Sequence, residues 1–373
     1  MSRPLNVILD VTSRCNLKCV MCYFAGTDRL SFPPHEAEPA DGNMPLPVFE
    51  KIAAEMFPRA WRVALGCAAE PMIHPNFREI LSIAGRYGVP DLWFPTNLLA
   101  LTESSARAIV DAGVRTVAAS IDGTTRETYE KIRVPAKWER LLSCLEVLKE
   151  VRRSSRGKRP RLRIIFTWMK SNRQELADLP AFAELWGADE LDVRYVSPTV
   201  GVDVGPELLS GEDPRVLNAE LGRAARDAVR RGLRLSSYPE FETRADRPST
   251  LVGRARRRLW LIRSGIDRWE HRRHAIAQRL YGCAYPDRHY VIRPNGAVAP
   301  CIYWEGDPIG LYPGDGLAAI SRGAPLARIR DGLRSGTPIG TCAGCGERRT
   351  ALYRLRGTAA PVTSAGRLPT HPR

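Results

Sequence analysis

The chain has 373 residues, which is longer than a typical single domain, so one large domain and a smaller one are expected. Its apolar share of 44% and charged share of 26% are those of an ordinary globular protein. The sequence holds no apolar run long enough to cross a bilayer and no secretory signal, so we expect a cytoplasmic protein without membrane insertion. Disulfides are rare in that reducing compartment, so the nine cysteines indicate metal binding.

The formal charge of +15 comes mostly from arginine. A chain this basic can bind nucleic acid. However, the sequence carries no helix-turn-helix, zinc-finger or RNA-recognition signature. We therefore expect no nucleic-acid partner, and we attribute the charge to genome composition, with attraction of an anionic substrate as the alternative.

Strand-like and helix-like runs alternate over the first 200 residues. Strands are predicted over 5–12, 61–67, 91–97, 114–122, 162–169 and 191–196. Helices are predicted over 46–57, 76–87, 103–112, 138–153 and 175–186. Such alternation is typical of right-handed βαβ units around a parallel sheet. The expected fold is α/β, a partial (β/α)6 parallel barrel with a small C-terminal cysteine-rich extension.

Four regions follow from the pattern along the chain. Residues 1–240 hold the partial barrel, including a helix over 216–231 and a strand over 233–237. We expect residues 241–282 to form a basic helical connector whose apolar stripe packs while its arginines are solvated; contact with a membrane surface or an anionic substrate is the alternative. The cysteine-rich region spans 283–356, and the tail over 357–373 has the composition of a disordered segment.

Three cysteines follow the first predicted strand with the spacing C-x3-C-x2-C: Cys15, Cys19 and Cys22. Cysteine thiolates are the standard ligands of iron–sulfur clusters. Three of them leave one iron of a four-iron cluster without a protein ligand, and open coordination is typical of reactive metal sites. A zinc knuckle would need a fourth ligand, and no Cys or His lies between Cys22 and His35. Chance clustering is the other alternative.

This cysteine run resembles the signature of the radical S-adenosylmethionine (radical SAM) enzymes. The resemblance implies a [4Fe-4S] cluster whose open iron holds SAM, which is cleaved reductively to a 5′-deoxyadenosyl radical. The run from Gly66 to Pro71 is similar to the family's Gly-Glu-Pro motif through Glu70, although alanines stand at 68 and 69 where glycine is common. Cys67 in this run lacks a paired cysteine, so we expect it to be a small packed residue.

Two further elements resemble family motifs at the ends of the third and fourth strands. The run Thr96-Asn97-Leu98 is similar to Thr-Asn-Gly with leucine in place of glycine, and Ser120-Ile-Asp-Gly is a close match. In relatives the serine and a following arginine reach the SAM ribose or carboxylate, and a guanidinium suits such a zwitterion. The predicted cofactor-binding residues are Cys15, Cys19, Cys22, Glu70, Asn97, Ser120, Asp122 and Arg133.

A second set of cysteines lies near the C-terminus: Cys283, Cys301, Cys342 and Cys345. Between its first two members, Asn295-Gly296 predicts a two-residue hairpin turn. Four thiolates can complete a zinc site or a fully ligated cubane. The segment resembles the SPASM region of radical SAM maturases, which implies one auxiliary [4Fe-4S] cluster. Its expected role is to accept an electron from the substrate, to bind substrate or to hold the extension together.

The sequence thus predicts a radical SAM oxidoreductase that receives electrons from an external donor such as flavodoxin or ferredoxin. Only fourteen residues precede Cys15, which leaves no room for a peptide-recognition module. That favours a small-molecule biosynthetic intermediate of sugar, aminocyclitol or nucleoside type as the substrate. A maturase of a ribosomally made peptide is the alternative, and a non-catalytic metal-binding protein that contacts nucleic acid is a second one.

Overall fold

The computed structural model describes residues 5–27, 30, 39–155, 160–196, 202–237, 283 and 285–345. The predicted basic connector and the predicted tail lie outside these residues. In the described part of the chain, no helix has the length and apolar character needed to cross a membrane.

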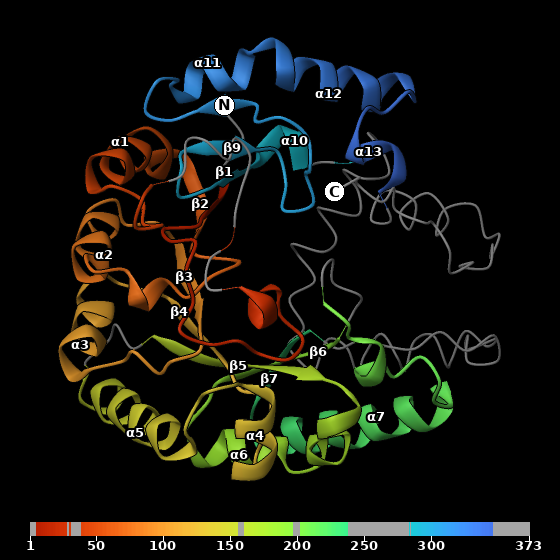
Figure 1. The fold of residues 1–373 in the computed structure, drawn as a ribbon. Helices are drawn as coiled ribbons and strands as arrows, with labels where there is room; N and C mark the ends of the chain where they lie inside the picture. The colour runs from red at the N-terminus through yellow and green to blue at the C-terminus, as the bar shows by residue number, and fades with distance from the viewer. Residues whose placement is uncertain are drawn as a thin grey trace.

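A single curved sheet forms the centre of the molecule, in the order β10-β9-β8-β1-β2-β3-β4-β5-β6-β7 (Figure 1). The seven N-terminal strands are parallel and follow one another in chain order. They are β1 (Leu5–Leu9), β2 (Ala60–Leu65), β3 (Asp91–Thr96), β4 (Thr116–Ser120), β5 (Arg161–Trp168), β6 (Glu190–Tyr195) and β7 (Arg234–Ser237). The parallel barrel predicted from the alternation is therefore confirmed as an open sheet, and β7 corresponds to the short strand predicted over 233–237.

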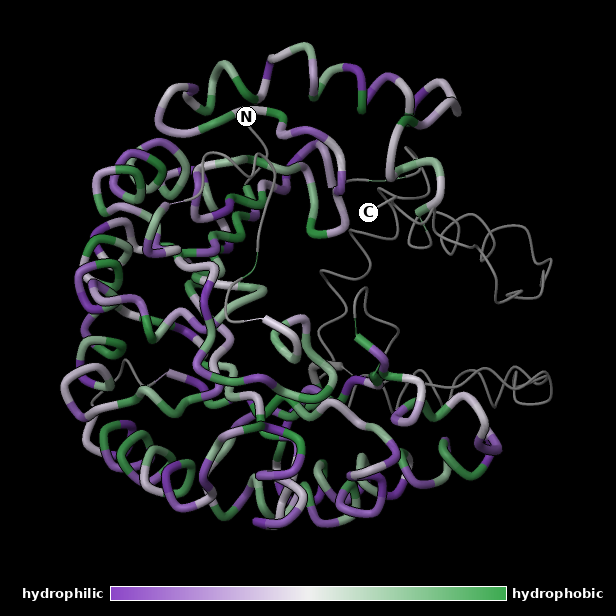
Figure 2. The backbone as a smooth tube through the Cα atoms, in the orientation of Figure 1, coloured by the Kyte–Doolittle hydropathy of each residue, from purple (hydrophilic) through white to green (hydrophobic). Residues whose placement is uncertain are grey.

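Seven helices of the barrel cover the outer face of the sheet, which places the carboxyl ends of the strands around a common interior (Figure 1). They are α1 (Leu46–Met56), α2 (Phe77–Gly85), α3 (Glu103–Asp111), α4 (Arg126–Ile132), α5 (Trp138–Ser154), α6 (Leu179–Leu185) and α7 (Pro214–Arg230). On α5 the leucines at 141, 145 and 148 recur at helical spacing and are fully buried. Figure 2 shows the same alternation of apolar and polar stretches along the outer helices.

Two helical segments differ from the sequence prediction. The helix predicted over 175–186 begins later, because Pro180 suits the first turn of α6 and a 3-10 helix, η5 (Lys170–Leu176), precedes it. The helix α4 has no counterpart among the predicted helices. The Thr125 hydroxyl accepts the amide proton of Thr128 and caps α4 at its N-terminus.

The C-terminal region continues the barrel sheet. Its strands are β8 (His289–Ile292), β9 (Ala297–Ala299) and β10 (Gly310–Leu311). The strand β8 pairs in parallel with β1, and β9 and β10 follow in antiparallel order. Four helices, α10 (Tyr285–Arg288), α11 (Leu317–Arg322), α12 (Ala324–Ser335) and α13 (Thr341–Gly344), complete the extension. The cysteine-rich region thus shares a sheet with the barrel, and its boundaries as a separate domain remain a prediction.

The hairpin between β8 and β9 has a wider turn than the sequence predicts. The carbonyl of Arg293 accepts the amide proton of Gly296, and the amide of Arg293 donates to the carbonyl of Ala297. Only Gly296 has a positive φ, at 81°, whereas a two-residue type I′ turn needs it at both central residues. Pro294 occupies the second position of a four-residue turn, where its fixed φ is favourable. The predicted two-residue turn is therefore wrong, and the hairpin itself is present.

Candidate functional site

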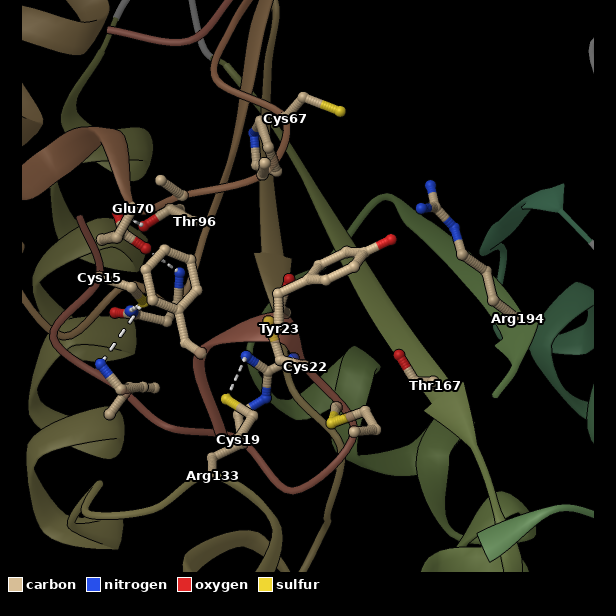
Figure 3. A pocket seen from close by; sticks show the side chains of 18 of the residues that line it. Cys15, Cys19, Cys22, Tyr23, Cys67, Glu70, Thr96, Arg133, Thr167 and Arg194 are labelled. Carbon is tan, nitrogen blue, oxygen red and sulfur yellow. Dashed lines mark hydrogen bonds between the residues drawn. The ribbon is translucent and has the colours of Figure 1, made fainter. Parts of the chain in front are cut away.

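A cavity of about 400 Å³ opens at the carboxyl ends of the barrel strands (Figure 3). The thiols of Cys15, Cys19 and Cys22 line it together. The remaining predicted cofactor residues that line it are Glu70, Asn97, Ser120 and Arg133. The fold thus brings into one cavity side chains that come from the ends of four successive strands and the loops that follow them.

The cysteine loop is held by apolar anchors and by backbone hydrogen bonds. Leu17, between the first two cysteines, and Phe24, after the third, are almost fully buried. The amide of Lys18 donates to the carbonyl of Val134 at 2.6 Å, and the amide of Val20 donates to the carbonyl of Ile132 at 3.0 Å. The loop therefore rests on the segment at the end of α4, which keeps the thiols on the inner face of the sheet.

Glu70 is a buried carboxylate that ties two loops together. One of its oxygens accepts the hydroxyl proton of Thr96 at 2.7 Å, and the other accepts the amide proton of Asn97 at 2.5 Å. Burial raises the pKa of Glu70 to about 7, although the hydrogen bonds from Asn97, Thr96 and Met72 oppose that shift. The side-chain amide of Asn97 in turn donates to Asn16 at 2.7 Å and lies 3.9 Å from the sulfur of Cys15. Glu70 thus positions the loop after β3 against the cysteine loop.

Leu98 has a positive φ of 70°, which it shares with no other non-glycine residue in the described part of the chain. In the resemblance drawn from the sequence, glycine is the usual residue at this position. The backbone needs the left-handed conformation, which glycine adopts freely and leucine only at a cost of roughly 1–2 kcal/mol. The leucine side chain is fully buried, and this burial offsets the strain.

Arg133 and Asp122 form a buried ion pair behind Cys19. The Nε and Nη2 atoms of Arg133 lie 2.8 and 2.5 Å from one carboxylate oxygen of Asp122. The Nη1 atom lies 3.9 Å from the sulfur of Cys19. Asp122 is fully buried and does not line the cavity; its other oxygen accepts the amide proton of Thr167. Asp122 therefore holds the guanidinium of Arg133 in place, and Arg133 presents this guanidinium to the sulfur of Cys19.

Cys67 is exposed and lines the cavity, so the sequence-based expectation of a packed side chain is wrong. The reason is the loop that follows β2, in which the amides of Cys67 and Ala68 both donate to one oxygen of Asp10, at 2.6 and 3.1 Å. These two bonds hold the backbone against the end of β1 and leave the thiol on the inner side. Asp10 is absent from the residues predicted from the sequence, although a carboxylate directly after a buried strand is a usable signal.

The four C-terminal cysteines line a second, much smaller cavity of about 20 Å³ together with Tyr303 and Leu333. The topology thus brings together Cys283, Cys301, Cys342 and Cys345, which the sequence grouped only by spacing. A cavity of this size holds about one water molecule or one ion.

The donor sets fit metal binding by their chemistry, but neither set is preformed. Within the described residues, no three His, Cys, Asp or Glu side chains are grouped as a ready-made metal-ion site. Burial raises the pKa of Cys15 and of Cys283 to about 12, and that of Cys19 and of Cys301 to about 11. These four thiols are therefore protonated without metal, and a bound metal must displace those protons.

Comparison with known proteins agrees with this geometry. The model of the Radical SAM superfamily matches residues 9–157. A cofactor-modifying protein for tungsten-containing aldehyde ferredoxin oxidoreductase from Pyrococcus furiosus is 25% identical over 246 residues, 64% of either chain. An AdoMet-dependent heme synthase from Methanosarcina barkeri is 27% identical over 219 residues, 58% of this chain and 57% of the relative. The chain thus spans less than two thirds of the length of these curated relatives.

The fold has a solved counterpart in SuiB of Streptococcus suis bound to S-adenosylmethionine. The TM-score is 0.64 at 16% sequence identity, over 92% of this chain and 71% of SuiB. The similarity extends well beyond the matched family segment and includes most of the C-terminal extension. The described barrel and extension therefore share one architecture with that structure.

Proposed function

Because this chain belongs to the radical SAM superfamily, with a SPASM-like C-terminal region, we propose that Cys15, Cys19 and Cys22 hold its SAM-binding [4Fe-4S] cluster. With the cluster and SAM bound, the site would supply the chemistry of reductive SAM cleavage to a 5′-deoxyadenosyl radical, for hydrogen-atom abstraction from the substrate. The observation that carries this proposal is that the three thiols of one loop line one cavity at the strand ends. The electron comes from an external donor such as flavodoxin or ferredoxin.

The protein side chains of the cavity bind and orient. Arg133 and the hydroxyl of Ser120 face the cavity and suit the carboxylate and ribose of SAM. Glu70 and Asn97 fix the loop edges against which the cofactor lies. Asp122 lies behind the wall and holds the guanidinium of Arg133 in place.

For the substrate we propose a small-molecule biosynthetic intermediate. Support comes from the two curated relatives, whose names describe work on a cofactor and on heme. The second candidate is a ribosomally made peptide, which the fold likeness favours, since SuiB has also been solved with its precursor peptide SuiA. The C-terminal thiols would hold one auxiliary cluster, which is the arrangement expected from the SPASM resemblance.

The proposed cluster site is tested by electron paramagnetic resonance of the anaerobically reconstituted and reduced protein. Addition of SAM should change the spectrum of one cluster, because SAM becomes a ligand of the open iron. The change should be absent in Cys22→Ala and present in Cys144→Ala, whose thiol is buried in α5, donates to the carbonyl of Leu101 and lines neither cavity. A spectrum that does not respond to SAM in the wild-type chain contradicts the proposal.

A further inference from the structure

Arg194, near the end of β6, faces the cavity from the side opposite the cysteine loop. It lines the same 400 Å³ space, and its side chain is 52% exposed. In Figure 3 the hydroxyl of Tyr23 and the thiol of Cys67 both point toward the side of the cavity that Arg194 occupies. Nothing in the sequence signals this residue, since it sits inside a strand-like run.

One edge of the Arg194 guanidinium is already fixed. Its Nε lies 3.0 Å and its Nη2 lies 2.5 Å from the two carboxylate oxygens of Asp192, which is almost fully buried. Burial lowers the pKa of Arg194, but the bond and charge of Asp192 outweigh that effect and raise it. Nη1 has no hydrogen-bond partner among the residues that the structure describes. A guanidinium has five donors, so this arginine is held rigidly with donors left over on the cavity side.

The other buried carboxylates around this space already have partners within the protein. Asp10 lies 2.7 Å from Arg293, and Asp122 is bound by Arg133. Glu70, the buried carboxylate that lines the cavity, already accepts hydrogen bonds from Thr96, Asn97 and Met72. Among the described residues, the carboxylate that binds Arg194 is Asp192. Tyr303, from the C-terminal extension, is half exposed and interacts electrostatically with Arg194. Tyr303 of the extension thus lies near Arg194, although it is not among the residues that line this cavity.

We propose that Arg194 binds an anionic group of the substrate, a carboxylate or a phosphate, and orients the substrate toward the cysteine loop. This inference rests on the proposed function, since it takes the cavity to be the reaction site. A fixed guanidinium with free donors pairs with such anions bidentately and with directional preference. The exposed rings of Tyr23 and Tyr195 beside it suit a flat or apolar portion of the same molecule.

The test uses Cys67 as a reporter in the reconstituted holoenzyme, where the cluster ligands are protected. Cys67 is the exposed cysteine of the cavity wall, and its alkylation can be followed by mass spectrometry of its peptide. The rate with anionic iodoacetate is divided by the rate with neutral iodoacetamide, so the thiolate fraction cancels. We expect this ratio to fall about fivefold in Arg194→Gln, because one unit charge at close range is worth about that factor in wet surroundings.

Three variants serve as controls. Arg194→Lys keeps the charge and should keep most of the ratio. The double change Asp192→Asn with Arg194→Gln removes the buried unpaired carboxylate, so it preserves the test if the single variant folds poorly. Arg62→Gln removes an arginine that is paired with Asp91 outside the cavity, and it should leave the ratio unchanged.

Competition identifies the anion. Inorganic phosphate or acetate, at constant ionic strength, should lower the wild-type ratio toward that of Arg194→Gln. The anion that acts at the lower concentration indicates whether the substrate group is a phosphate or a carboxylate. A ratio that neither anion changes, or that Arg194→Gln leaves intact, overturns the proposal. The proposal is also overturned if SAM alone lowers the wild-type ratio to that of Arg194→Gln, because Arg194 would then bind the cofactor and not the substrate. SAM cleavage is measured separately, so failure of the anion site and failure of the proposed function are distinguishable.

Discussion

Asp10 and Arg293 join the beginning of the barrel to the C-terminal extension. The Nη1 atom of Arg293 lies 2.7 Å from one carboxylate oxygen of Asp10, which is fully buried. The other oxygen of Asp10 accepts the amide protons of Cys67 and Ala68 in the cavity wall. One carboxylate therefore connects the extension, the end of β1 and the loop that leads to Glu70.

Breaking this pair should destabilise the protein. Arg293→Gln leaves the charge of Asp10 buried without its partner, which typically costs about 3–5 kcal/mol. The double variant Asp10→Asn with Arg293→Gln should lose less than the sum of the two single variants, because their effects share one interaction. Urea unfolding of the four proteins measures this coupling. Strictly additive effects would show that the two side chains act independently.

Leu98 should reverse the usual order of alanine and glycine. At most positions a protein with glycine is less stable than the same protein with alanine. At a φ of 70°, however, alanine keeps the backbone strain and glycine relieves it. Both changes lose the buried leucine side chain, at about 2–5 kcal/mol. We expect Leu98→Gly to be more stable than Leu98→Ala by up to about 1 kcal/mol in thermal or urea unfolding. A markedly less stable glycine variant would mean that the left-handed backbone carries no strain.

Glu70 should make stability depend on pH. Its pKa is raised from an ordinary 4.5 to about 7, chiefly by burial, so between these values the folded chain holds a proton that the unfolded chain has lost. Stability contributed by this group is therefore complete below pH 4.5 and falls as pH rises to about 7, by of order 2–3 kcal/mol. Subtracting the unfolding free energies of Glu70→Gln from those of the wild-type chain across this range isolates the effect. A difference that is flat with pH, or that rises, contradicts the assignment.

The C-terminal cysteines should bind metal independently of the N-terminal three. Reconstituted protein should hold about eight iron atoms, and the triple alanine variant of Cys15, Cys19 and Cys22 about half of them. Cys342→Ala should lose the other half and lower the melting temperature, because metal binding there stabilises the extension. Elemental analysis checks this. Zinc in place of the second four irons would agree with the small size of the second cavity and would exclude an auxiliary cluster.

The sequence predicts the barrel well because its signals are local. Each strand from β1 to β6 is a short apolar run between turn signals, and the motif residues follow directly at the carboxyl ends. The three thiols with Glu70 and Asn97 can thus be assigned to one edge of the sheet from the order of the residues alone. The grouping of the four C-terminal cysteines can likewise be predicted from their positions in the sequence.

Contacts between distant segments cannot be predicted in this way. The pairing of β8 with β1 joins residues more than 280 positions apart, and the sequence of neither strand predicts which strand it pairs with. The exposure of Cys67 depends on Asp10, and the orientation of Arg194 depends on Asp192 within the same strand. Such side chains acquire a role only when the sheet has curved around the cavity.

The central claim is that the three-cysteine loop supports reductive cleavage of SAM, and product analysis tests it most directly. Under anaerobic reduction, the wild-type chain and the Cys144→Ala control should convert SAM to 5′-deoxyadenosine and methionine. The triple alanine variant of Cys15, Cys19 and Cys22 should form neither product while keeping its fold by circular dichroism, because the barrel core lies elsewhere. Formation of 5′-deoxyadenosine at the wild-type rate by the triple variant would contradict the account.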